Sequence, residues 1–330
     1  MKSKERTVAD AGEFGCIREI CRDLIYRPEL VKIGAGDDGA VYVSPPDMDQ
    51  VISTDTMAEG IHFTAETMTP ADVGWKLAAA NFSDMAAMGA EPAQFVVSAA
   101  LPAGLPMAWV LGCYEGLRAA CRAFRVNLLG GDITGSRQGV VLTGTVVGFV
   151  PEDQAVRRSG AVPGDLLAVT GTLGDSAAGL DAIFAGRAEA YPALAEKHRR
   201  PLPQIEAGRI LREAGVHALD DITDGLAEEA AEIAEASGVS LVIGAEKVPL
   251  SEEARRAAAA FGKDPLRYAL TGGEDYQLLA AGPAACIARA AEKLPLTVIG
   301  RAEEGCGVFL TGNGTKEPLP RIGYDHFRDH

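Results

Sequence analysis

Short β-rich runs alternate with alanine-rich segments of helical periodicity along most of this chain. The longest β-rich run is Val140–Val150, and two clear helical segments lie at 71–88 and 107–124. Alternation of this kind is typical of proteins in which helices pack against a β-sheet. We therefore expect an α/β (α+β) fold.

A turn-rich segment, Pro151–Gly164, separates two stretches with this pattern. It combines proline, glycine and charged residues, which favour turns over regular structure. The 330 residues of the chain suffice for roughly two domains of about 150 residues each. We expect these domains at 1–150 and 151–330.

The helix expected over Ala71–Met88 has recognisable start and end signals. Thr69 is a suitable N-cap, Pro70 suits the first turn, and Asp72 completes a capping box. Gly89 follows the last helical residue, where glycine commonly ends a helix.

Asp84 shares one face of this helix with Asn81 and Met88, at spacings of three and four residues. A buried, hydrogen-bonded aspartate would explain this polar residue, and so would a metal ligand that projects from the helix. The spacing alone leaves both interpretations open.

A strongly amphipathic helix is expected over Asp224–Ser237. Leu226, Ala230, Ile233 and Ala234 form one apolar stripe, which we expect to be buried. The glutamates lie away from this stripe, and we expect all four to be solvated: Glu228, Glu229, Glu232 and Glu235.

The charge balance excludes several classes of partner. The chain has 46 acidic and 31 basic residues, a net charge of −15. Nucleic acid and anionic membranes need a basic protein face, so neither is an expected partner. No uncharged apolar run reaches the ~18 residues of a membrane span, and the first residues lack the apolar core of a signal peptide. We expect a cytoplasmic enzyme.

The positions of the acidic residues are more informative than their number. Several stand beside glycine or hydroxyl residues near the expected ends of β-rich runs, where α/β proteins bind ligands. Each one alone is more typical of a turn or a helix N-cap. Taken together, they favour a site for several Mg²⁺ ions, because Mg²⁺ binds carboxylate oxygens and substrate phosphates. The segments are 36–38, 53–55, 130–132, 220–225 and 272–275.

One apparent dinucleotide-binding motif is rejected. Gly34, Gly36 and Gly39 match the spacing G-x-G-x-x-G, but a β-rich run, Ala40–Val43, follows where the motif needs a helix. The chain also lacks a Walker A motif and the protein-kinase motifs. Nucleotide chemistry in this chain therefore needs a different architecture.

The motifs resemble those of the thiamine-monophosphate kinase family, in the superfamily of aminoimidazole ribonucleotide synthetase and selenophosphate synthetase. The resemblance covers nearly the whole chain. His62 in GIHF, Glu274 in GGEDY and the terminal GYDHF point to the kinase family rather than to the synthetases. The other segments that carry it include GAGDDGAV, STDTMAEGIHF, NFSDMAAMGAEP, LLGGDITGS, RSGAVPGD, HRRPLPQ and DDITDGL.

The resemblance implies ATP-dependent phosphorylation of thiamine monophosphate to thiamine diphosphate, the last step in making this cofactor. It also implies an N-terminal domain that binds ATP and Mg²⁺ and forms a barrel across a homodimer. A C-terminal α/β domain is expected to close the site. Another ATP-dependent enzyme of the superfamily, such as a cyclase, and a non-catalytic Mg²⁺–nucleotide binding module are the alternatives.

The resemblance also assigns residues, position by position. The implied Mg²⁺ ligands are Asp38, Ser53, Thr54, Asp55, Asp84, Asp132, Asp221 and Asp224. The implied nucleotide contacts are Tyr114, Gly131, Asp132, Arg158 and Thr223, and the implied contacts to thiamine monophosphate are His62, Glu274 and Phe327, with Tyr324 as an alternative to Phe327. Thr223 and Gly39 stand where the family usually has Ser and Ala.

No catalytic general base is expected. The acceptor is a phosphate with a second pKa near ~6, so it is largely deprotonated at neutral pH. Direct in-line transfer then depends on positioning and electrostatics. Without the resemblance, Arg158 would be interpreted as a surface arginine, His62 as a structural histidine and Glu274 as a turn residue.

Overall fold

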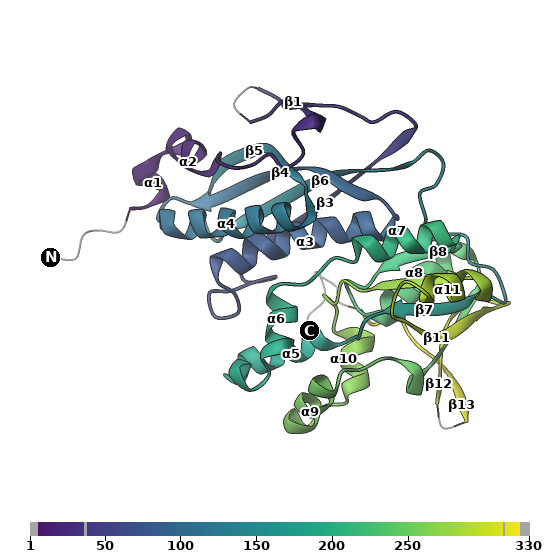
Figure 1. Cartoon of the computed structure of the whole chain (residues 1–330). Helices are drawn as coiled ribbons and strands as arrows, with labels where there is room; N and C mark the ends of the chain where they lie inside the picture. Colours follow the sequence, from purple (N-terminus) through teal and green to yellow (C-terminus); the bar gives the residue numbers. More distant parts are fainter. Residues whose placement is uncertain (1–5, 36–37, 313, 324–330) are drawn as a thin grey trace. The chain divides into compact units, whose positions relative to one another are not determined.

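The computed structural model describes residues 6–35, 38–312 and 314–323 (Figure 1). The chain divides into two compact units, one of Met1–Phe82 with Glu91–Glu152 and one of Ser83–Ala90 with Asp153–His330. Within the described residues, no helix is both long and apolar enough to cross a membrane.

Unit 1 is built on a four-stranded sheet in the order β3-β6-β4-β5. Its strands are β3 (Met48–Ala58), β6 (Val141–Pro151), β4 (Glu91–Pro102) and β5 (Asn127–Ser136). Strands β4 and β5 are parallel, and the other two pairs are antiparallel. The smaller elements of the unit are α1 (Val8–Ala11), α2 (Glu13–Ile20), η1 (Pro28–Leu30), β1 (Val31–Ile33) and β2 (Val41–Tyr42).

Two helices cover one face of this sheet, α3 (Pro70–Ala87) and α4 (Met107–Phe124) (Figure 1). Phe82 of α3 packs edge-on against Phe95 of β4, with 5.3 Å between the ring centroids. The two helices also touch each other, because a Cβ at Gly74 would lie 1.9 Å from the carbonyl oxygen of Cys113. Glycine therefore permits the close packing that places both helices over the sheet.

The predicted ends of α3 are confirmed. Thr69 and Asp72 form the capping box, with the Asp72 N–H donating to Thr69 Oγ1 (3.3 Å) and the Thr69 N–H donating to Asp72 Oδ2 (3.1 Å). Gly89 follows the helix with φ 64°, a conformation that glycine adopts without strain. The predicted range of α4 is also confirmed.

Two strands are longer than the sequence predicted. Strand β5 continues through Gly130, Gly131 and Asp132 instead of ending there, and β3 continues past Asp55 to Ala58. Both segments are therefore held by ladder hydrogen bonds within strands. The prediction that these acidic residues lie at strand ends was wrong.

Unit 2 is built on a seven-stranded sheet in the order β13-β12-β9-β11-β7-β10-β8. Its strands are β7 (Leu166–Thr170), β8 (Ala218–Asp221), β9 (Ser240–Gly244), β10 (Leu278–Gly282), β11 (Leu296–Glu303), β12 (Gly307–Gly312) and β13 (Thr315–Pro318). Only the β9–β12 pair of this sheet is parallel.

Helices cover both faces of this sheet. Successive side chains of a strand point to opposite faces, so one strand contributes to the cores on both sides. On β7, Leu167 and Val169 pack in one core with Ile233, whereas Ala168 packs in the other with Leu211. The helices of the unit are α5 (Asp175–Phe184), η2 (Ala188–Ala190), α6 (Pro192–Arg199), α7 (Ile205–Ala214), α8 (Leu226–Ser237), η3 (Ala245–Lys247), α9 (Glu252–Phe261), α10 (Pro265–Thr271) and α11 (Ala284–Ala291).

Candidate functional site

Strand β3 carries three of the predicted Mg²⁺ ligands, Ser53, Thr54 and Asp55. The Thr54 hydroxyl donates to the Gly144 carbonyl oxygen of β6 (2.7 Å). The Asp55 N–H donates to Oδ1 of Asn81 on α3 (3.3 Å). Successive side chains of a strand point to opposite faces, so Thr54 faces the side opposite to Ser53 and Asp55. The three residues form a rigid segment, but their side chains are divided between two faces.

Asn81 is the link between this segment and α3. Its side chain is fully buried, and its amide nitrogen donates to the Leu77 carbonyl oxygen (2.9 Å) while its oxygen accepts from Asp55. A Cβ at Gly144 would lie 2.5 Å from that amide nitrogen, so glycine leaves the space that Asn81 occupies. Asn81 was not among the predicted site residues. Asp84, one turn further along α3, is partly buried.

Strand β5 carries Gly131 and Asp132, the latter exposed and paired with Ser98 of β4. The β4–β5 register shifts between Phe95 and Val96, which marks a β-bulge just before Gly131. A Cβ at Gly131 would lie 1.8 Å from the Val97 carbonyl oxygen. Only glycine fits this position, so its place in the motif has a structural cause whether or not a nucleotide contacts it.

His62 lies in the turn that follows β3. Its Nδ1 accepts from the Ala58 N–H (3.1 Å), so the proton of a neutral imidazole is on Nε2. This contact fixes the orientation of the ring. This local contact is a structural reason for a histidine, and it is compatible with substrate binding.

The remaining predicted residues of unit 1 and the predicted C-terminal aromatic residue differ in their exposure or lie outside the described residues. Asp38 is exposed, in a bend between β1 and β2. Tyr114 of α4 is only 6% exposed, and burial raises the pKa of its phenol, which is therefore neutral. Phe327 and Tyr324 lie outside the described residues.

In unit 2, the structure brings two predicted segments together, the loop after β8 and the loop before β10. The Glu274 N–H donates to the Thr223 carbonyl oxygen (2.7 Å), and the Tyr276 N–H donates to the Ile222 carbonyl oxygen (2.9 Å). A Cβ at Gly273 would lie 2.4 Å from the Thr223 oxygen. Asp221 ends β8, and Asp224 follows in the loop. Predicted metal, nucleotide and substrate residues on these two loops thus lie together at one end of the sheet.

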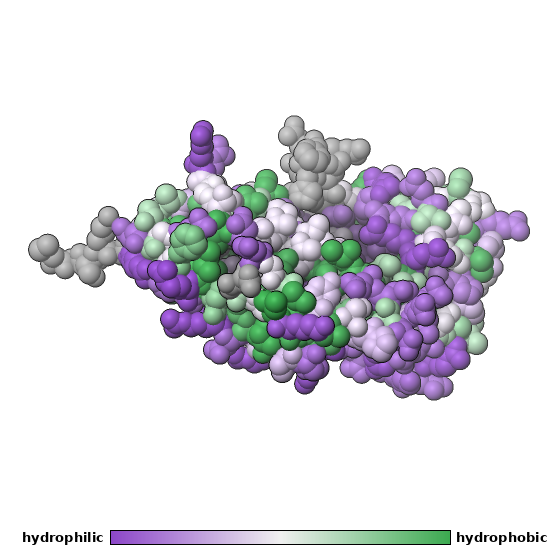
Figure 2. All heavy atoms as spheres, turned by 90° about the horizontal axis from the view of Figure 1, so that it is seen from above, coloured by the Kyte–Doolittle hydropathy of each residue, from purple (hydrophilic) through white to green (hydrophobic). Residues whose placement is uncertain are grey.

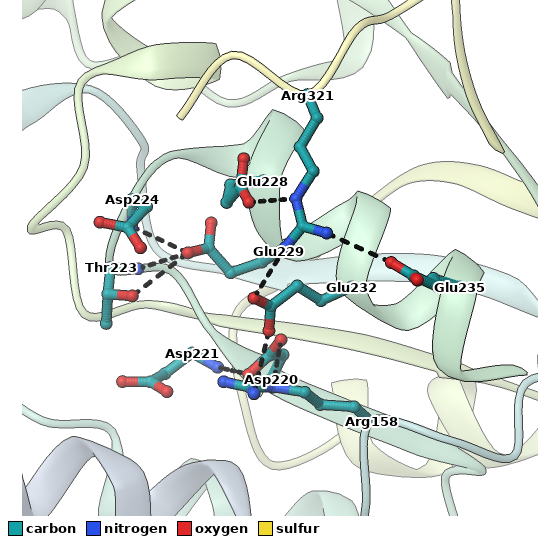
Figure 3. Close-up of polar contacts among 10 residues, drawn as sticks. All are labelled: Arg158, Asp220, Asp221, Thr223, Asp224, Glu228, Glu229, Glu232, Glu235 and Arg321. Atoms are coloured by element: carbon teal, nitrogen blue, oxygen red, sulfur yellow. Dashed lines mark hydrogen bonds and ion pairs between the residues drawn. The ribbon is translucent and has the colours of Figure 1, made fainter. Parts of the chain in front are cut away.

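Glu229 of α8 holds the first of these loops (Figure 3). Its Oε1 accepts from the N–H of Asp224 (2.8 Å) and from the N–H and hydroxyl of Thr223 (3.2 Å each). The side chain is 3% exposed, and burial raises the pKa of its carboxyl well above the usual range. The prediction that Glu229 is solvated was wrong, because a glutamate in a first helical turn can cap the backbone of the preceding loop.

Asp220 and Glu232 hold Arg158 (Figure 3). The Arg158 Nε donates to both Asp220 carboxylate oxygens (2.9 Å each), and Nη1 lies 2.9 Å from Glu232 Oε2. Asp220 is 1% exposed, and burial raises the pKa of its carboxyl to about 7, although the Arg158 guanidinium acts in the opposite direction. The arginine thus has a defined orientation, which an isolated surface residue lacks.

A second group of buried polar residues supports Glu274. His198 is 2% exposed, and its Nδ1 lies 3.1 Å from Ser176 Oγ and 3.5 Å from Glu274 Oε2. The neighbouring Asp275 accepts from the N–H groups of Gly174 (2.6 Å) and Ser176 (3.2 Å). Burial raises the pKa of Asp275 to about 7, while these N–H groups lower it.

Sequence reasoning therefore assigned no role to four residues that support the site, Asn81, His198, Glu229 and Glu232, and it included Asp220 and Asp275 only as members of acidic segments. Asp220 and Asp275 adjoin predicted residues, so acidic pairs were the available signal. Glu229 follows Asp224 closely enough along the chain for its side chain to accept hydrogen bonds from the backbone of the preceding loop. His198 begins the segment HRRPLPQ, which carries part of the family resemblance, but no role in the site was predicted for it.

The residues offer Mg²⁺ suitable chemistry, because carboxylate and hydroxyl oxygens are the ligands that it prefers. Within residues 6–35, 38–312 and 314–323, no three acidic, histidine or cysteine side chains form a group that could hold a metal ion. Mg²⁺ is commonly bound by one or two carboxylates, with waters and substrate phosphates as its other ligands.

Comparison with known proteins identifies the architecture. Residues 36–150 match the N-terminal domain of AIR synthase related proteins, and residues 162–313 match the C-terminal domain. Thiamine-monophosphate kinase of Bacillus subtilis is 34% identical over 334 residues, which cover 96% of this chain and 99% of that protein. The relative from Aquifex aeolicus is 38% identical over 322 residues, 96% of this chain and 99% of that one.

Two solved structures show the same likeness in three dimensions. Thiamine-monophosphate kinase from Stenotrophomonas maltophilia superposes with a TM-score of 0.80 at 34% identity, over 90% of this chain and 96% of that one. A structure described as AaThiL complexed with AMPPCP and TMP gives a TM-score of 0.79 at 34% identity, over 98% of this chain and all of the other.

Proposed function

Because this chain belongs to the thiamine-monophosphate kinase family, within the AIR synthase related proteins, we propose that it phosphorylates thiamine monophosphate with ATP. The product is thiamine diphosphate. The observation that carries the proposal is the likeness over 98% of this chain to a structure that holds both TMP and the ATP analogue AMPPCP. The quoted motifs are spread over both units.

We propose that several Mg²⁺ ions accompany the substrates. Both substrates are anions and the chain has a net charge of −15, so their direct approach is electrostatically unfavourable. The carboxylates of Asp55 and Asp132 in unit 1, and of Asp221 and Asp224 in unit 2, are suitable ligands. Mg²⁺ supplies positive charge that offsets the charge on the transferred phosphoryl group.

We propose direct in-line transfer without a protein base. The acceptor phosphate is largely deprotonated at neutral pH, so no proton has to be removed from it. Arg158 is the cation that the chain offers to the polyphosphate. Asp220 and Glu232 engage Nε and Nη1, which leaves Nη2 of the guanidinium for a phosphate oxygen.

We propose that Glu274 recognises the cationic thiazolium ring of thiamine monophosphate. Its backbone is fixed by Thr223, and its side chain, 28% exposed, lies beside the buried His198. A carboxylate with a defined position can favour a cation over a neutral ring. His62 and Phe327 are the other proposed substrate contacts.

We propose that two copies of this chain form a homodimer through the face of the unit 1 sheet opposite α3 and α4. Ile52 of β3 is 69% exposed and Val96 of β4 is 37% exposed, although both lie in the sheet. Figure 2, seen from above, shows hydrophobic surface in the left and central part of the molecule. Exposed apolar side chains on a sheet face are typical of an interaction surface.

The test incubates the protein with ATP, Mg²⁺ and thiamine monophosphate and separates the products by chromatography. We expect thiamine diphosphate and ADP in equal amounts, and no product when EDTA removes Mg²⁺. Unphosphorylated thiamine serves as the matched control acceptor. Absence of thiamine diphosphate, with ATP converted to ADP only when an aminoimidazole precursor is added, would overturn the proposal in favour of a cyclase.

A further inference from the structure

Arg321 attaches the C-terminal segment to α8 (Figure 3). Its guanidinium pairs with three glutamates, through Nε to Glu228, Nη2 to Glu232 (3.1 Å) and Nη1 to Glu235 (3.2 Å). These glutamates are spaced by four and three residues and therefore share one helix face. The Gly323 N–H donates to Glu228 Oε2 (3.3 Å). The segment is thus fixed up to Gly323, the first residue of the GYDHF motif.

Glu232 connects this attachment to the proposed nucleotide contact. Its Oε1 accepts a hydrogen bond from Arg321 Nη2, and its Oε2 forms an ion pair with Arg158 Nη1 at 2.9 Å. Each oxygen of one carboxylate therefore serves a different arginine. Because the carboxylate is rigid and planar, the position of one guanidinium restricts that of the other.

The burial of the partners supports a defined geometry. Asp220 is 1% exposed and Glu232 is 27% exposed, whereas the arginines are about half exposed. An isolated surface ion pair contributes little to stability, because two long side chains must be ordered to form one weak contact. Here the buried carboxylate of Asp220 restricts Arg158 on one side. The carboxylate of Glu232, which also contacts Arg321, restricts it on another, so the contacts form a network.

We propose that Arg321 is a positioning residue for the nucleotide, acting through Glu232 on Arg158. The inference rests on the proposed kinase function and on the proposed contact between Arg158 and ATP. Arg321 keeps the Glu232 carboxylate turned so that Arg158 presents Nη2 to the polyphosphate. The segment that begins the GYDHF motif is thereby coupled to the nucleotide side of the reaction.

The Glu232→Gln variant distinguishes an effect of Arg158 orientation from an effect of the charge beside Arg158. Glutamine has the same shape, but it has one acceptor oxygen and cannot serve both arginines. Loss of a negative charge beside Arg158 would by itself lower KM for ATP. Loss of orientation instead raises KM for ATP by about 3- to 10-fold, a change that lies within the range of couplings between contacting residues. We expect this rise, with an unchanged KM for thiamine monophosphate.

The second test is a double-mutant cycle with Arg321→Met and Arg158→Met. Arg321→Met should raise KM for ATP by about 3- to 10-fold in the wild-type background and by less than about 2-fold when Arg158 is already methionine. A purely electrostatic effect of Arg321 would persist in both backgrounds. The matched control is Arg301→Met, which removes another exposed arginine paired with a glutamate, Glu303, and should leave both KM values unchanged.

Thermal melting of every variant checks that it folds, and Glu232→Gln keeps the proposal testable if Arg321→Met does not. An unchanged or lower KM for ATP in Glu232→Gln, or an Arg321→Met effect of equal size in both backgrounds, would overturn it. A rise confined to KM for thiamine monophosphate would also overturn it, since Arg321 would then only anchor the C-terminal segment. A wild-type protein without kinase activity contradicts the proposed function itself, and binding of AMPPCP with Mg²⁺ then still tests the coupling.

Discussion

The two units hold their proposed site residues in different ways. In unit 1, Asp55 and Asp132 are part of strands, and the ladders of β3 and β5 fix their backbones. In unit 2, Thr223, Asp224 and Glu274 lie in loops, and buried side chains such as Glu229 hold them in place.

This difference determines which substitutions should disturb each site. A strand needs space for close approach of its neighbours, so small residues such as Gly131 and Gly144 support the site of unit 1. A loop needs partners for its N–H groups, so buried carboxylates support the site of unit 2. Substitutions of supporting residues should therefore act by steric conflict in unit 1 and by lost hydrogen bonds in unit 2.

The largest effect is expected from the ligands themselves. Asp55→Asn or Asp132→Asn should lower turnover about 10³-fold, as loss of an electrostatic group at a reacting centre does. Melting temperatures should stay within about 2 °C of the wild type, because the ladder hydrogen bonds remain. Steady-state kinetics and thermal melting measure the two quantities.

The control for these variants is Asp49→Asn, on the same strand as Asp55 but outside the predicted ligands. We expect its turnover to lie within about twofold of the wild type, because surface substitutions seldom have larger effects. Near-wild-type turnover in both ligand variants would refute the metal assignment for unit 1.

The steric support of unit 1 is tested by Gly131→Ala. A methyl group there would meet the Val97 carbonyl oxygen at 1.8 Å, so β4 and β5 must separate. We expect a loss of about 3 kcal/mol in the free energy of unfolding, measured in urea. Gly135→Ala on the same strand meets nothing within 4 Å and should change it by about 0.5 kcal/mol at most. Equal effects at both positions would contradict the steric explanation.

The hydrogen-bonded support of unit 2 is tested by Glu229→Ala. The variant leaves the N–H groups of Thr223 and Asp224 without their acceptor, which should cost about 2 kcal/mol and raise KM for ATP. Glu229→Gln keeps an acceptor oxygen and should lose roughly half as much. Urea unfolding, and hydrogen exchange at these two amides, report the loss directly.

Glu235→Ala provides the contrast, since that side chain is on the same helix and 78% exposed. It should change the unfolding free energy by about 0.5 kcal/mol or less. If Glu229→Ala were as mild as Glu235→Ala, the loop of unit 2 would not depend on its buried carboxylate.

The last expected effect is a pH dependence from Asp275. Burial raises its pKa to about 7 in the folded chain, against roughly 3.9 in an unfolded one. The folded state therefore holds the proton more tightly, so this stabilisation is complete below about pH 4 and is lost as the pH rises through about 7. Asp275→Asn cannot titrate, so its unfolding free energy should fall less between pH 5 and pH 8.

We expect this difference between wild type and variant to be about 1 to 3 kcal/mol across that interval. Urea unfolding at pH 5, 6, 7 and 8 measures it. Parallel curves for wild type and Asp275→Asn would show that this carboxyl is already charged in the folded protein at pH 5.

The sequence predicted the helices of unit 1 well because their signals are local. Thr69, Asp72 and Gly89 lie within or beside α3, and their capping interactions involve neighbours along the chain. The apolar stripe of α8 was confirmed for the same reason, since Leu226, Ala230 and Ile233 are all fully buried.

Strand ends were predicted less well. Gly130, Gly131 and Asp132 have low strand propensity, so a pattern based on propensity ends the strand before them. In the structure, pairing with β4 overrides this preference, and the absence of a Cβ at Gly131 allows the close approach. The cause is a neighbour that is far away in the sequence.

The sequence by itself determined the α/β class, the ends of α3 and α4, and the set of acidic motifs that indicates the family. These features depend on local periodicity, capping and residue order. Only the tertiary structure decided which glutamates of α8 are solvated and which hold Thr223, Asp224, Arg158 and Arg321. Periodicity reports which helix face is apolar, but the partner of a polar side chain depends on which distant loop packs beside it.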